Sequence, residues 1–141
     1  MKPQFTVAIC PLSLACCFVT SQVQAQHMNA PDAPCRGPNS NAELTACFIS
    51  ASRLADDRLN KTYVRILEVL SGDEIRDLRV AQRLWVKSRD ANCSAEQNLY
   101  RGGSAAPTVH AACVEANTRY RTNDLKTVYG WRLEKLGKSI D

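Results

Sequence analysis

Of the seven cysteines of this chain, three lie in the apolar N-terminal run, and the other four are the residues best suited to chemistry. Cys35, Cys47, Cys93 and Cys113 stand 12, 46 and 20 positions apart. Structural zinc sites usually draw their ligands from close pairs such as C-x2-C, which these gaps do not offer. An even set of cysteines in a small exported chain is instead typical of disulfides. We predict two disulfides and no metal site. Cys35–Cys47 with Cys93–Cys113 is one of three possible pairings, and the sequence does not choose between them.

Acid–base and nucleophilic catalysis lack their usual residues here. His27 lies in an N-terminal leader, and His110 stands alone near the start of a predicted helix. The adjacent acids Asp56-Asp57 and Asp73-Glu74 would point about 100° apart on a helix, so neither pair can act as a catalytic couple. No glycine-rich phosphate loop follows a strand. We therefore expect a protein that is not an enzyme and that has no cofactor.

Arg89 falls in step with Trp85 and Cys93, so it should lie near the inward face of its helix. A charged group near a core needs a partner. We predict a structural polar network that fixes the register of the helices, with a binding role as the alternative; Asp56→Ala should then lower the melting temperature sharply. The predicted members are Asp56, Asn60, Gln82, Arg89, Thr118 and Arg121.

Three helical segments must position these residues. Ser40 to Glu43 and Ser71 to Glu74 both read as capping boxes, and apolar residues recur at helical spacing over 44–70 and 75–93. The stretch 101–107 carries two glycines and a proline and predicts a loop, after which a third apolar row runs from Val109 to Trp131, with Gly130 weakening its last turns. The short turn near residue 71 requires the first two helices to pack antiparallel. We expect an all-α fold, a small three-helix antiparallel bundle stapled by two disulfides.

The N-terminal segment is typical of export. Residues 1–25 predict a signal peptide, because an apolar run too short to span a membrane ends at a small-residue site, Val23 to Ala25. A lipid anchor at Cys16 is the alternative, since residues 12–16 resemble a lipoprotein cleavage site. Residues 26–39 should form an extended leader held only by Cys35, 40–136 the helical domain and 137–141 a tail. We place the mature protein in the periplasm or outside the cell, without a transmembrane helix.

The charge pattern argues against nucleic acid as a partner. The formal net charge is +4 at pH 7, and lysines and arginines alternate with acids along the predicted helices. This spacing is typical of a solvated face and not of a basic stripe.

The chain resembles the LprI-type lysozyme inhibitor family, a group of exported bacterial helical domains. The resemblance covers roughly residues 35–125 and implies the three-helix fold, the two disulfides and a lysozyme as protein partner. Its residues are Cys47; Ala55, Asp56, Leu59, Asn60 and Tyr63; Ala81, Gln82, Arg83, Trp85, Arg89, Asp90 and Cys93; Gly102, Gly103 and Ser104; Cys113; and Thr118, Arg121 and Leu125.

An inhibitor of this kind need only fill the lysozyme cleft and offer donors to its two catalytic carboxylates. The loop Arg101, Gly102, Gly103, Ser104 is the predicted partner-binding segment, because glycines allow close approach while Arg101 and Ser104 supply donors. The alternative is a non-catalytic cell-envelope module that binds another periplasmic protein or peptidoglycan. A small-ligand carrier would need a cavity, for which three helices with Trp85 in the packed stripe leave little room.

Overall fold

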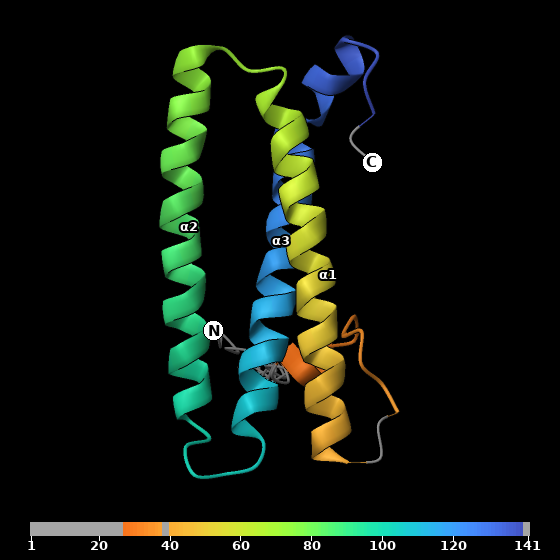
Figure 1. Cartoon of the computed structure of the whole chain (residues 1–141), viewed down its shortest axis with the longest axis vertical. Coiled ribbons are helices and arrows are strands. Elements are labelled where there is room, and N and C mark those ends of the chain that lie inside the picture. Colours follow the sequence, from red (N-terminus) through yellow and green to blue (C-terminus); the bar gives the residue numbers. More distant parts are fainter. Residues whose placement is uncertain (1–26, 38–39, 140–141) are drawn as a thin grey trace, which may run out of the picture.

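The computed structural model describes residues 27–37 and 40–139. A short 3-10 helix, η1 (His27–Asn29), precedes three long helices, α1 (Asn41–Leu67), α2 (Gly72–Asn98) and α3 (Ala106–Lys135), and the described residues form no strand. Successive helices run in opposite directions (Figure 1), which confirms the all-α antiparallel three-helix fold. The predicted signal peptide and Cys16 lie outside the described residues. None of the described helices is long and apolar enough to cross a membrane.

Side-chain caps define the starts of the first two helices. The Ser40 hydroxyl accepts a hydrogen bond from the Glu43 N–H at 3.2 Å, and the Ser71 N–H donates to Oε2 of Glu74 at 2.8 Å. Both helices therefore begin where the capping pattern places them. The helix ends differ from the prediction: α2 continues past Cys93 to Asn98, because the segment 94–98 contains no glycine or proline. Gly130 is buried inside α3, which runs on to Lys135.

The third helix is the central one. It packs extensively on both α1 and α2, whereas α1 and α2 meet only sparsely, and α2 stands apart from α1 in Figure 1. The expectation that α1 and α2 pack antiparallel is confirmed in their directions and in the cluster that their side chains share, but their backbones approach each other at few points. The reason lies in the side chains: α3 buries small residues such as Ala111, Ala112 and Ala116, which allow close approach, whereas the hydrophobic residues that α2 buries are Leu78 and Cys93.

Two apolar clusters fill the bundle. One joins the leader, α1 and α3 around Phe48, and the other joins all three helices around Ile66 and Leu125. Three residues of the predicted inward row of α3 are exposed instead: Tyr120 at 43%, Val128 at 57% and Trp131 at 56%. A single apolar row wrongly includes them because α3 contacts its neighbours on two sides, so the buried face of the helix shifts along its length.

Both predicted disulfides are present. Cys35 is bonded to Cys47 and Cys93 to Cys113. The first bond ties the leader to α1, and the second ties the C-terminal part of α2 to the N-terminal part of α3. Since neighbouring helices are antiparallel, both covalent links lie at the same end of the bundle.

The leader is held by more than Cys35, contrary to the prediction. Ala33 is buried against α1 and α3, with Met28 and Ala30 packed beside it. Oδ2 of Asp32 accepts hydrogen bonds from Nη1 of Arg119 at 2.7 Å and from the hydroxyl of Tyr120 at 3.2 Å. The hydrogen bond from Arg119 lowers the pKa of Asp32 below its usual value.

Arg119 also anchors a buried acid. Its Nε donates to Oε1 of Glu115 at 2.9 Å, and the Glu115 side chain is only 5% exposed. Burial alone would lower the pKa of Arg119, but the hydrogen bonds to Glu115 and Asp32 outweigh that effect and raise it. The guanidinium therefore stays charged and joins the leader to α3.

Candidate functional site

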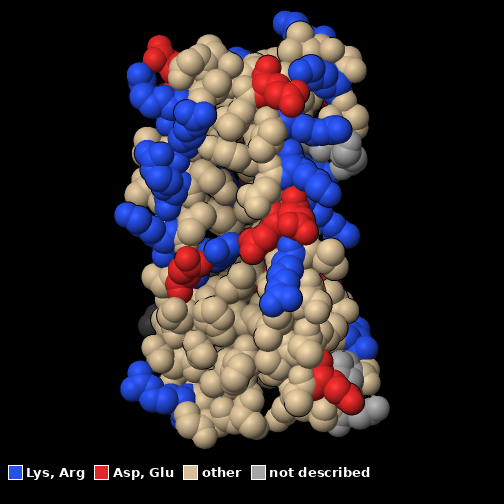
Figure 2. Space-filling model, viewed as in Figure 1, with Lys and Arg blue, Asp and Glu red and all other residues tan. Residues whose placement is uncertain are grey.

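A polar groove separates α1 from α2. Its volume is about 350 Å³, and it lies where the two helices do not pack on each other. Figure 2 shows this side of the molecule: basic residues lie along the α2 edge, acidic residues cross the middle, and the lower part carries few charges. The residues that line the groove are Asp56, Leu59, Asn60, Tyr63, Arg79, Gln82, Arg83, Trp85, Val86 and Arg89.

Arg89 links the three helices at one end of this groove. Its Nη1 donates to Oδ1 of Asp56 on α1 at 3.1 Å and to the hydroxyl of Thr118 on α3 at 3.0 Å, and its Nε donates to Oδ1 of Asp90 at 2.9 Å. The Arg89 side chain is 13% exposed and Thr118 is fully buried. The structure thus brings three of the six predicted network residues into direct contact.

Trp85 is flanked by two guanidinium groups. The ring centroid lies 5.1 Å from Cζ of Arg89 and 5.8 Å from Cζ of Arg121, distances at which a cation is attracted to an indole ring. Nε of Arg121 also donates to Oε1 of Gln82 at 3.1 Å. Gln82 and Arg121 therefore join the network through Trp85. Asn60 lies on the groove wall without a hydrogen bond to any described residue.

The α2 wall of the groove offers two further cations. Arg79 and Arg83, one helical turn apart, make no hydrogen bond or ion pair within the described part of the chain. Together with Asn60 and Tyr63 on the opposite wall they present donors to the groove. This arrangement can bind carboxylates or amides. The residues that line the groove include no histidine, cysteine or serine.

The predicted binding loop lies apart from the groove, at the end of the bundle that carries the disulfides. Residues 101–104 are exposed, and Gly102 has a positive φ of 84°, a conformation that favours glycine. Ser104 accepts a hydrogen bond from Nδ2 of Asn41 at 3.0 Å, and Nη2 of Arg101 donates to Oδ1 of Asn98 at 3.1 Å. The loop is therefore held against the N-terminus of α1 while its donors face solvent.

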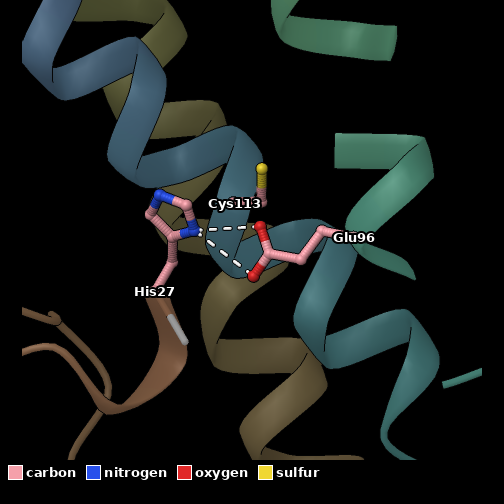
Figure 3. A group of neighbouring side chains, drawn as sticks. All are labelled: His27, Glu96 and Cys113. Carbon is pink, nitrogen blue, oxygen red and sulfur yellow. Dashed lines mark hydrogen bonds and ion pairs between the residues drawn. The ribbon is translucent and has the colours of Figure 1, made fainter. Parts of the chain in front are cut away.

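A contact between His27 and Glu96 was not foreseen from the sequence. Nδ1 of His27 lies 3.0 Å from Oε2 of Glu96, and the Cys113 sulfur lies beside the pair (Figure 3). These three are the group of described residues whose donor atoms are close enough to hold a metal ion. Cys113 is bonded to Cys93, so its thiolate is not available as a ligand. The residues pair across 69 positions of sequence, and no local pattern signals such a contact.

Similarity to known proteins identifies the family of this chain. The model of the family "Lysozyme inhibitor LprI" matches residues 34–125. An uncharacterized protein of Rhizobium meliloti (strain 1021) is 32% identical over 126 residues, covering 80% of this chain and 87% of the relative. No solved structure matches the chain significantly. The family match spans both disulfides, the groove and the loop.

Proposed function

Because the chain belongs to the LprI lysozyme inhibitor family, we propose that it binds a lysozyme, occludes its active-site cleft and so protects the bacterial cell wall. The family is extracytoplasmic, and two disulfides fit an oxidising compartment. The observation that carries the proposal is the extent of the match, which includes the complete bundle except the last turns of α3. The proposal assigns no catalytic step to this chain.

The loop Arg101, Gly102, Gly103, Ser104 remains our proposed contact segment. It is exposed and tethered at both ends, so little conformational freedom is lost when a partner orders it. Arg101 provides a charged donor suited to a carboxylate, and the glycines let the backbone approach closely. The surroundings of the loop carry few charges in Figure 2, which limits repulsion by a cationic lysozyme.

Most exposed acids of the first two helices are already paired within the chain. Asp73 and Asp77 contact Arg76, and Glu74 contacts Arg132. Paired acids contribute little attraction at long range. We therefore expect association with a cationic lysozyme to gain little from electrostatic steering and to change only weakly between low and physiological salt.

The test is a titration of the oxidised protein into an animal-type lysozyme, with wall lysis and heat of binding followed together. Stoichiometric inhibition supports the proposal, and absence of binding to several lysozyme classes removes it. The double variant R101A/S104A should weaken inhibition without changing the melting temperature. The matched control K87A/S88A removes one exposed cation and one exposed hydroxyl of α2, away from the loop, and should inhibit like the parent. Equal inhibition by R101A/S104A and the control excludes the loop from the interface.

A second candidate is a cell-envelope interaction module that binds another periplasmic protein or peptidoglycan. The groove between α1 and α2 favours it, because Arg79 and Arg83 are free to bind carboxylates of peptidoglycan stem peptides. Sedimentation with purified cell wall tests this function. Wall binding that R79Q/R83Q abolishes, without any effect of the parent on lysozyme, would favour this candidate over the inhibitor.

A further inference from the structure

A second cleft lies on the other side of α1 from the polar groove, between α1, α3 and the leader. Its volume is about 650 Å³, within the range of small-molecule sites in proteins. No local pattern in the sequence predicts this space, and its size differs from the expectation that three helices leave little room for a ligand. Leu54, which is 58% exposed, is among the residues that line this cleft.

The floor of the cleft is apolar and its rim is basic. Ala51, Leu54 and Ala55 contribute the apolar surface from α1. Arg58 and Lys61 on α1 and Lys126 on α3 flank it from two sides. Arg58 and Lys61 make no hydrogen bond or ion pair with any residue that the structure describes. These two unpaired cations lie beside exposed apolar surface. The stability of the fold does not require this combination, so it points to a ligand.

The other charges of the lining cancel within the protein. Glu115 is the acid among the lining residues, and its buried carboxylate is bonded to Arg119. Arg119 also donates to Asp32, so this guanidinium is committed to the leader. The charge that remains for a ligand is therefore positive and is carried by Arg58 and Lys61.

We propose that this cleft binds a single-chain anionic amphiphile, a molecule with one acidic head group and one alkyl chain, such as a free fatty acid. The alkyl chain would lie on Leu54 and the neighbouring alanines, and the acidic head would bind Arg58 and Lys61. A purely apolar ligand would leave the cations without partners, and a strongly charged polymer would leave the exposed leucine uncovered. The proposal is independent of lysozyme inhibition, because the loop Arg101 to Ser104 does not line this cleft.

The probe for the test is sodium dodecanoate, added below its micelle concentration to the oxidised full protein and followed by calorimetry. We expect one dodecanoate per chain. The double variant R58Q/K61Q should weaken binding about tenfold or more, because it removes both charge-assisted contacts with the acidic head group. Leu54→Ser should also weaken binding, and dodecanol should bind less tightly than dodecanoate.

The double variant R79Q/R83Q is the matched control, because it removes two exposed and unpaired arginines from one face of a helix at the other groove. It should bind dodecanoate like the parent. Equal weakening by both double variants would show attraction by net charge alone and would overturn the proposal. Absence of 1:1 binding, equal affinity for dodecanol, or binding only to an acidic peptide or to phosphatidylglycerol vesicles would overturn it too. Lysozyme inhibition measured on R58Q/K61Q should be unchanged.

Discussion

Replacement of Arg89 by alanine should destabilise the bundle by about 2–3 kcal/mol. Loss of the hydrogen bond to the fully buried Thr118 hydroxyl costs about 1–1.5 kcal/mol. The contacts with Asp56 and Asp90, whose side chains are 45% and 56% exposed, are screened by solvent and contribute about 0.5 kcal/mol or less each. Stacking on Trp85 adds roughly 0.5–1 kcal/mol.

The assay is urea unfolding of the oxidised protein, followed by circular dichroism, with the melting temperature as a second measure. A loss of this size should lower the melting temperature by roughly 10–15 °C in a domain of this length. Asp90→Ala is the control for a solvent-exposed contact and should cost about 0.5 kcal/mol or less. Asp56→Ala should also cost about 0.5 kcal/mol, less than the sharp effect predicted from the sequence, because Asp56 is half exposed and Arg89 keeps its other partners. A loss below about 1 kcal/mol for Arg89→Ala, or a larger loss for Asp56→Ala, would refute the assignment of Arg89 as the centre of the network.

Three further predictions concern the ends of the bundle. Serine at Cys93 and Cys113 removes a link across 20 positions and should cost about 3 kcal/mol in urea unfolding; an unchanged midpoint would contradict this. Hydrogen bonds from the Ser71 backbone and then from Arg132 lower the pKa of Glu74 to about 2, so its contribution to stability is complete above its unfolded pKa near 4.5 and disappears as the pH falls towards 2. Glu74→Gln should therefore make the free energy of unfolding depend less on pH between about 2 and 4.5. The same pH dependence in the variant and the parent would count against the contact. Asp32→Asn should speed amide hydrogen exchange in residues 28–34 while α2 stays protected, and uniform exchange across the chain would show global destabilisation instead.

Local signals predicted the elements of this fold well. The hydroxyl of Ser40 and the carboxylate of Glu74 cap their helices where the sequence placed them, because capping depends on residues three positions apart. The presence of two disulfides also followed from the number of cysteines and their context. Arg89 binds two of the predicted residues, because a charged group on an inward helix face needs a polar partner and few polar groups lie within its reach.

The packing of the helices on one another could not be predicted from such local signals. Whether α2 packs on α1 or on α3 depends on side-chain shape across helices, and the short turn fixes direction without fixing contact. The polar groove and the basic-rimmed cleft both depend on which helices pack on each other. The leader contacts through Asp32 and His27 join residues 87 and 69 positions apart, so no local pattern could reveal them.

The positions of the network residues allow them a role in binding as well as in folding. All of the residues that line the polar groove except Arg79 and Val86 are among those that carry the resemblance to the family. The sequence interpretation treated them as a record of folding. Asp56 and Asn60 instead lie on a solvent-accessible wall, where the same side chains can both hold the helices in register and meet a partner.

Each disulfide joins cysteines that follow one another directly along residues 26–141: the first with the second, and the third with the fourth. During synthesis the N-terminal part of the chain emerges first. An oxidase that joins each cysteine to the next one to appear would therefore produce the native pairing without rearrangement. Formation of the native disulfides then requires oxidation alone, and a cell that lacks a disulfide isomerase should still produce the protein in its native form.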